Sequence, residues 1–131
     1  MEKKEKKTIL VVDDDKTILE SLRIILQSEG YRVDTAETGR EAIEKIRNQS
    51  YHLALLNIWL PDMKGTELLT TLQESFPEMV KIMLTGLPSD RAKEFLNLGA
   101  DTYIVKPVDP DELLKVVKEK LKEQEEAKSV R

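Results

Sequence analysis

The fold of this chain is decided by the segment Leu53-Ala54-Leu55-Leu56-Asn57-Ile58-Trp59-Leu60-Pro61-Asp62. Four successive apolar residues, followed by a polar residue and a loop, are typical of a strand that is buried on both faces. Strands of this kind belong to parallel sheets, in which ligands bind beyond the carboxyl ends of the strands. The segment therefore predicts a sheet, and it puts Asn57 at the edge where a site would lie.

Strand-like runs alternate with helical periodicity along the rest of the chain. Besides 53–56, strands are predicted at 9–12, 31–36, 80–84 and 102–105. Helices are predicted at 16–28, from a capping box at 38–41 to 48, at 66–75, from a cap at Ser89 to 98, and from a cap at Asp109 to 126. Five strands alternating with five helices predict an α/β fold, a flavodoxin-like (βα)5 arrangement with a doubly wound five-stranded parallel sheet.

Composition narrows the class of protein. The 131 residues suggest one domain, at 8–124, between charged tails at 1–7 and 125–131. The C-terminal charged stretch is either a solvated helix end or the start of a linker. The net charge of -4 argues against direct contact with nucleic acid, and the absence of cysteine excludes disulfides. No apolar run approaches the length that crosses a bilayer, and the charged start does not resemble a secretory signal. A cytoplasmic protein is expected.

Reactive side chains follow four of the predicted strands, so they should meet at one edge of the sheet. An acidic cluster, Asp13-Asp14-Asp15, follows the first strand. Asp13 and Asp14 could hold a hard divalent ion such as Mg2+, with a further oxygen from the end of the 53–56 strand. Alternatively, Asp14 or Asp15 caps the helix at 16–28.

Thr85-Gly86 and Lys106-Pro107 end two other apolar runs. Lys106 could offset the charge of a phosphoryl group or pair with the acidic cluster, and its bond to Pro107 is a candidate for the cis form. Thr85 could donate its hydroxyl to a phosphoryl oxygen, and Gly86 would leave room for an incoming group. The alternatives are an ordinary surface lysine, a strand threonine and a turn glycine.

Three other side chains are weaker candidates. Tyr103 precedes Lys106 on the same predicted strand, and its ring could move between buried and exposed positions or stay half-buried. Trp59 lies in the loop after Asn57 and could report on the site or simply pack on the surface. His52 has no partners at metal-ligand spacing and is interpreted as incidental.

Taken in order, these motifs resemble the receiver domain of two-component response regulators, the CheY-like family. The resemblance covers about residues 8 to 124. It rests on Val11-Val12-Asp13-Asp14, Asn57-Ile58-Trp59-Leu60-Pro61-Asp62-Met63-Lys64-Gly65, Thr85-Gly86 and Tyr103-Ile104-Val105-Lys106-Pro107.

The resemblance implies roles for individual residues in phosphorelay signal transduction. It implies Mg2+ ligands at Asp13, at Asp14, at position 57 and at the backbone carbonyl of Trp59. It further implies phosphoryl contacts from Thr85, Gly86 and Lys106, and a switch residue at Tyr103.

The family also suggests partners. The implied partner is a sensor histidine kinase or another signalling protein, bound through the face formed by the fourth helix, the fifth strand and the fifth helix. A homodimer is a further candidate assembly. The module would signal by protein contact and would not be an enzyme.

Asn57 departs from the family pattern, because the family carries an aspartate that takes the phosphoryl group at this place. A carboxylate can attack a phosphoryl group, whereas a carboxamide cannot do so usefully. The amide would also weaken a Mg2+ site by removing one anionic oxygen. The chain is either a natural pseudo-receiver, deficient in phosphorylation, or a phospho-accepting receiver trapped by an introduced Asp-to-Asn change.

Two other classes of protein share part of the pattern. Asp13-Asp14-Asp15-Lys16-Thr17 resembles the opening motif of haloacid-dehalogenase-type phosphatases, with Asp13 as nucleophile and Asp15 as acid/base. That class needs a later acidic pair, and Asp109 and Asp111 better suit the start of a helix. A flavodoxin-like cofactor binder would need a phosphate-cradling first loop, which an acidic loop does not provide.

Overall fold

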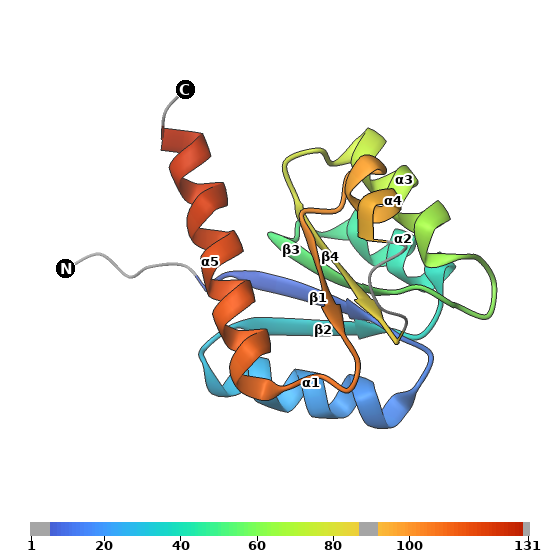
Figure 1. The fold of residues 1–131 in the computed structure, drawn as a ribbon, viewed down its shortest axis with the longest axis horizontal. Coiled ribbons are helices and arrows are strands. Elements are labelled where there is room, and N and C mark those ends of the chain that lie inside the picture. Colours follow the sequence, from blue (N-terminus) through green and yellow to red (C-terminus); the bar gives the residue numbers. More distant parts are fainter. Residues whose placement is uncertain (1–5, 87–91, 130–131) are drawn as a thin grey trace.

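The computed structural model describes residues 6–86 and 92–129, which form five strands and five helices in alternation (Figure 1). The strands are β1 (Thr8–Val12), β2 (Arg32–Ala36), β3 (Leu53–Asn57), β4 (Val80–Thr85) and β5 (Thr102–Val105). They pair in parallel in the order β2-β1-β3-β4-β5. The α/β fold predicted from the sequence, with its doubly wound five-stranded parallel sheet, is confirmed.

Helices cover both faces of this sheet. They are α1 (Lys16–Ser28), α2 (Gly39–Asn48), α3 (Gly65–Ser75), α4 (Ala92–Asn97) and α5 (Pro110–Ser129). In Figure 1, α1 and α5 lie on one side of the strands, and α2, α3 and α4 lie on the other. None of the helices in the described residues is long and apolar enough to cross a membrane.

Alternate side chains of the central strands pack into two separate hydrophobic cores, one on each face of the sheet. Ile9, Val11 and Leu55 pack with α1 and α5, whereas Leu10 and Leu56 pack with α2 and α3. All five of these side chains are fully buried. Two-sided burial explains why the strands read as continuous apolar runs, and it fixes the register that aligns the strand ends.

The element boundaries differ from prediction in a few places. The strands end at Asn57 and Thr85, because Asn57 pairs with Leu84 and Thr85 with Val105. Helix α3 begins at Gly65, and α5 continues to Ser129 because its last turns are rich in Glu, Ala and Lys, which favour helix. Residues 125–129 of the predicted charged tail are therefore helical, which agrees with the solvated-helix alternative for this stretch. The predicted cap at Ser89 lies outside the described residues.

Candidate functional site at the carboxyl edge of the sheet

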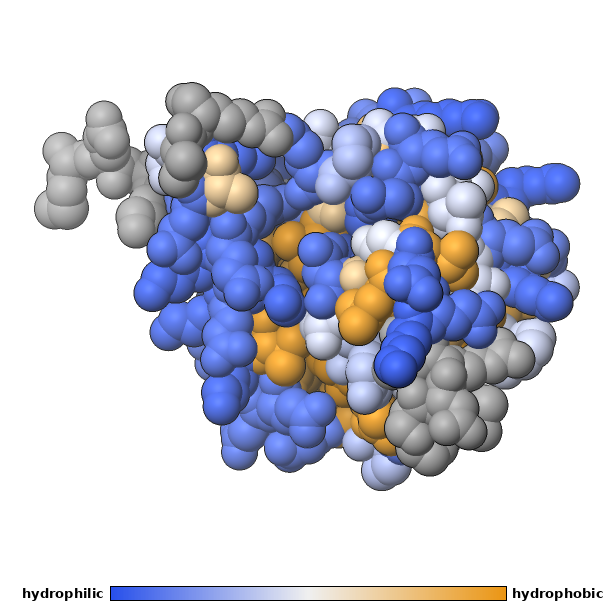
Figure 2. All heavy atoms as spheres, turned by 45° about the horizontal axis from the view of Figure 1, so that its top comes forward, coloured by the Kyte–Doolittle hydropathy of each residue, from blue (hydrophilic) through white to orange (hydrophobic). Residues whose placement is uncertain are grey.

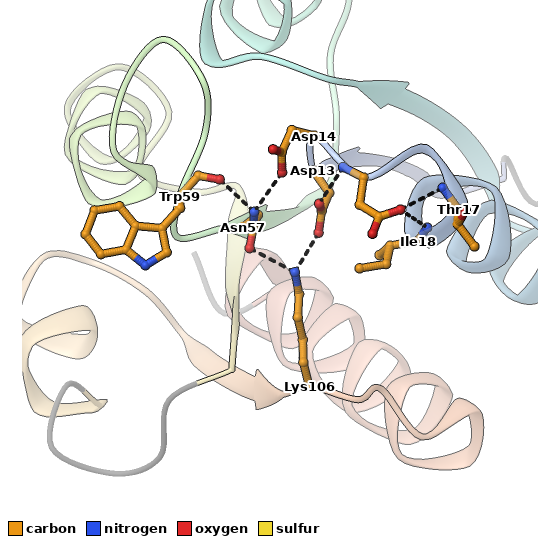
Figure 3. Close-up of polar contacts among 8 residues, drawn as sticks. Asp13, Asp14, Thr17, Ile18, Asn57, Trp59 and Lys106 are labelled. Atoms are coloured by element: carbon orange, nitrogen blue, oxygen red, sulfur yellow. Dashed lines mark hydrogen bonds and ion pairs between the residues drawn. The ribbon is translucent and has the colours of Figure 1, made fainter.

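The carboxyl ends of β1, β3 and β5 bring three polar side chains into contact (Figure 3). Asp13 directly follows β1, Asn57 ends β3, and Lys106 directly follows β5. Parallel pairing in register puts these positions at the same edge, although they are far apart in the sequence. The prediction that the reactive residues share one edge is thus correct for this group.

Lys106 lies at the centre of the group. Its Nζ is 2.9 Å from Asp13 Oδ2 and donates to Asn57 Oδ1, also at 2.9 Å. The Asp13 side chain is 1% exposed, so its charge depends on the lysine for compensation. The Lys106 backbone N–H donates to the carbonyl of Thr85, and the Lys106–Pro107 bond is cis, as predicted.

The amide of Asn57 makes a second set of contacts on its other side. Its Nδ2 donates to the Trp59 carbonyl oxygen at 2.8 Å and lies 3.4 Å from Asp14 Oδ1. The first is an ordinary hydrogen bond, whereas the second is long and acts chiefly through the charge of the carboxylate. Asn57 is thereby joined to three neighbours, Lys106, Trp59 and Asp14.

The acidic cluster divides into different roles. Asp15 caps α1, since its Oδ1 accepts from the backbone N–H groups of Thr17 and Ile18. The capping alternative is therefore correct for Asp15. Asp13 points inward and also accepts the Asp15 N–H at 2.9 Å, while Asp14 is exposed at the rim.

The other predicted residues lie around this group. Thr85 is 1% exposed at the end of β4, and Gly86 is exposed, with open space where a side chain would begin. Trp59 is 55% exposed in the loop between β3 and α3. Tyr103 is half-buried and packs against the core on the side of α2 and α3.

Two residues that shape the site were not singled out in the sequence. Asp62 accepts the backbone N–H groups of Gly39 and Arg40, each at 2.9 Å, and so ties the loop after β3 to the start of α2. The Arg40 and Gly39 N–H groups hold the pKa of the Asp62 carboxyl below its ordinary value. A β-carbon on Gly65 would overlap the backbone carbonyl of Asn57. Gly65 closes the receiver-like motif that begins at Asn57, but nothing in the sequence indicated this backbone contact.

Two of the expected Mg2+ ligands, Asp13 and the Trp59 carbonyl, already accept hydrogen bonds from N–H donors of the chain. Asp13 is bonded to Lys106 and Asp15, and the Trp59 carbonyl accepts from Asn57. No cluster of three or more acidic, histidine or cysteine side chains suited to a metal is found in residues 6–86 and 92–129. The donor set, as folded, does not fit a hard cation, because the Asn57 side that faces Asp14 carries hydrogen atoms and no oxygen.

Both the sequence and the fold of this chain are similar to those of known proteins. Residues 9–118 match the family model described as "Response regulator receiver domain". A CheY-like receiver domain protein from Methanospirillum hungatei JF-1 is 52% identical, with a TM-score of 0.90 over 94% of this chain and 99% of that one. CheY4 from Vibrio cholerae is 30% identical, with a TM-score of 0.83 over 88% of this chain and 98% of that one.

Longer proteins are also similar. The transcriptional regulatory protein DltR from Streptococcus agalactiae is 41% identical over 107 residues, which are 81% of this chain and 48% of DltR. The cell cycle response regulator CtrA from Brucella ovis is 36% identical over 107 residues, which are 81% of this chain and 46% of CtrA. The matched segment thus spans about half the length of these curated relatives.

Proposed function

The chain belongs to the response regulator receiver domain family, and from that premise we propose that it signals without a phosphoryl group on residue 57. Receiver domains are signalling modules of two-component systems, and they generally bind Mg2+ at the acceptor site. In this proposal Asn57 stands at the acceptor position, with Thr85, Gly86 and Lys106 as the phosphoryl-contacting residues and Tyr103 as the switch residue.

One observation carries the proposal, namely that the side chain held by Lys106 at the end of β3 is an amide. An amide oxygen is a far weaker nucleophile than a carboxylate, and its nitrogen has no available lone pair. The charged atoms of Lys106 and Asp13 lie 2.9 Å apart beside this amide, which supports their proposed roles at the acceptor position. The missing element is the nucleophile itself.

Output is proposed to occur through the face formed by α4, β5 and α5. Leu96 on α4 and Val105 on β5 are 48% and 40% exposed, which gives this face an apolar component. Figure 2 shows hydrophobic side chains reaching the surface beside the hydrophilic α5. A sensor histidine kinase or another signalling protein is the proposed partner, and a homodimer would use the same kind of contact.

The longer relatives bear on the setting of this module. DltR is named a transcriptional regulatory protein and CtrA a cell cycle response regulator, and each extends well beyond the matched segment. By analogy, the module would control an output domain or a separate protein. With a net charge of -4 it would not contact nucleic acid itself, and a cytoplasmic location remains our expectation.

Phosphorylation chemistry tests the proposal directly. Incubated with acetyl phosphate and Mg2+, the unaltered chain should show no added phosphoryl mass by intact-mass spectrometry. The Asn57→Asp variant should gain an acid-stable but base-labile acyl phosphate, and Asn57→Asp combined with Lys106→Met is the matched control for the site. An adduct on the unaltered chain would mean that another residue accepts the group, and the proposal would fail.

A second test concerns signalling. Beryllofluoride mimics a phosphoryl group only where a carboxylate oxygen completes its tetrahedron. The unaltered chain should therefore keep one affinity for its partner with and without the mimic, whereas Asn57→Asp should show two. A mimic-dependent gain in partner binding by the unaltered chain would contradict the proposed mode of action.

A further inference from the structure

The carboxyl edge of the sheet poses an electrostatic problem. Asp13 and Asp14 are adjacent in the sequence at the end of β1, and carboxylates placed this closely repel one another unless positive groups offset them. Lys106 offsets Asp13 at 2.9 Å. Among the described residues, Asp14 forms no ion pair, and the Asn57 amide nitrogen lies 3.4 Å from its Oδ1.

The neighbours of Asn57 leave its amide only one favourable orientation. As it stands, the oxygen accepts from the Lys106 ammonium, and the NH2 group faces the Trp59 carbonyl and the Asp14 carboxylate (Figure 3). Turned over, the NH2 group would face the ammonium, and the oxygen would face two other oxygens. Every contact would then be repulsive, so hydrogen-bond donors point to the side of Asp14 and Trp59.

A carboxylate at the same place would behave differently. Its two oxygens could accept from Lys106 on one side and bind a cation on the other, since a carboxylate accepts on both. An amide has one oxygen, which Lys106 already uses. A cation beside Asp14 and the Trp59 carbonyl would therefore meet the N–H groups of Asn57 and would have to displace them.

We propose that the NH2 group of Asn57 takes the place of a divalent cation, by linking the Trp59 carbonyl and the Asp14 carboxylate from within the chain. This inference rests on the proposed function and concerns the regulation of the same site. The unaltered module is then held in one state whether Mg2+ is present or absent. Asn57 acts here as a positioning residue for the loop after β3.

Other contacts of that loop agree with this role. Trp59 forms an isolated antiparallel bridge with Lys64, and the N–H of Gly65 donates to the Ile58 carbonyl. Asp62 ties the tip of the loop to the start of α2. Each of these bonds uses a donor and an acceptor of the chain, so the loop needs no metal to keep its shape.

Trp59 provides the readout, because it is the only tryptophan in the chain and its carbonyl is the group that is held. Thermal unfolding and Trp59 emission would be measured in a chelator and in millimolar Mg2+, with sodium chloride matching the ionic strength. The unaltered chain should show the same midpoint and emission in both. Asn57→Asp, with a third carboxylate at this edge, should unfold at a lower temperature in the chelator and recover with Mg2+.

The variant should also regain with Mg2+ the Trp59 emission of the unaltered chain, since the cation would then hold the carbonyl. Its Mg2+ affinity should exceed that of the unaltered chain by about ten- to a hundredfold, which is the strength of a displaced hydrogen bond to a charged group. Asn57→Leu is the control for shape, because it removes donor and acceptor together. Its emission should differ from that of the unaltered chain, and Mg2+ should not restore it.

A rise in midpoint or a shift in emission with Mg2+ that is as large in the unaltered chain as in Asn57→Asp would overturn the inference. So would an unchanged Trp59 emission in Asn57→Leu. Neither measurement involves a phosphoryl donor or a partner. If the unaltered chain takes no phosphoryl group but responds to Mg2+ as strongly as Asn57→Asp does, this inference fails and the proposed function stands. If it takes a phosphoryl group but does not respond to Mg2+, only the proposed function fails.

Discussion

The two edges of the sheet each enclose a lysine amine, and they satisfy it in different ways. At the carboxyl edge, Lys106 meets the carboxylate of Asp13 and the amide of Asn57. At the amino edge, Lys81 near the start of β4 is fully buried, and its Nζ donates to the Gln73 side chain and to the Phe76 carbonyl. One amine has an ionic partner near solvent, whereas the other has neutral acceptors in the core.

The difference indicates that the Lys106 contacts belong to a functional site, whereas the Lys81 contacts serve the stability of the fold. The Lys106 contacts come from side chains on two other strands, so they can change with a ligand, a cation or a substitution at position 57. The Lys81 contacts close the end of α3, whose last carbonyl groups lack partners within the helix. Burial lowers the pKa of the Lys81 amine, and the nearby Asp101 only partly opposes this effect.

The largest predicted effect is the loss of stability when one glycine at each edge of the sheet is replaced by alanine. Gly65→Ala should lower the free energy of unfolding by about 3 kcal/mol, because the new methyl group overlaps the Asn57 backbone, which cannot yield. Gly99→Ala should cost about 1–2 kcal/mol, because its backbone has a φ of 111° and its methyl group would meet the Gln73 side chain, which accepts from Lys81, rather than backbone. Urea denaturation of both variants measures the difference.

Gly86→Ala is the matched control at the carboxyl edge, since open space surrounds that position. Its stability should stay within about 0.5 kcal/mol of the unaltered chain. Alanine normally favours a helix over glycine by about 1 kcal/mol, so any net loss at Gly65 reflects the overlap. Equal losses at Gly65 and Gly99 would mean that the carboxyl edge is no more tightly built than the amino edge.

Most of the architecture could be predicted from the sequence, because local patterns encode it. The apolar run at 53–56 gave the central strand, and the capping roles of Asp15 and Thr38 marked helix starts that the structure has. Asp13, Asn57 and Lys106 were expected at one edge because each ends or follows an apolar run. These predictions require only the positions of the strands in the sequence and the parallel direction of their pairing.

The remaining features depend on contacts between distant segments. Lys81 was predicted only as part of the strand at 80–84. Nothing in the local sequence indicates that the Gln73 side chain and the Phe76 carbonyl accept hydrogen bonds from its amine. Asp62 read as a loop residue, although it serves as a second cap for a helix that precedes it in the chain. The orientation of the Asn57 amide likewise depends on neighbours from three other segments, which no spacing reveals.

A smaller effect is predicted for the tie that holds the loop at the carboxyl edge. Asp62→Ala should reduce the free energy of unfolding by about 1 kcal/mol near neutral pH, as the loss of a helix cap does. Thr38 still caps α2 in this variant, which limits the loss. Urea denaturation measures it, and Asp62→Asn, which keeps one acceptor oxygen, should lose less.

The pH dependence of this difference gives a second check. The folded-state pKa of Asp62 is lowered by the Arg40 and Gly39 N–H groups, so its contribution is complete above the unfolded-state pKa of about 3.9. It is lost as the pH falls through the folded-state pKa. The gap between the unaltered chain and Asp62→Ala should therefore narrow on acidification. A constant gap would mean that the carboxylate charge contributes nothing.

The smallest predicted effect is a rise in stability at alkaline pH that Lys81 at the amino edge should produce. Because burial lowers the folded-state pKa of Lys81 while the unfolded chain keeps about 10.4, the unfolded state binds more protons between these values. The contribution of Lys81 to stability is therefore complete above the unfolded-state pKa and falls as the pH drops through the folded-state value. As the pH rises from neutral to about 10.4, the unaltered chain should gain stability relative to Lys81→Met. Urea denaturation at both pH values gives the comparison, and parallel changes in the two proteins would show that the amine at the amino edge is buried without an electrostatic cost.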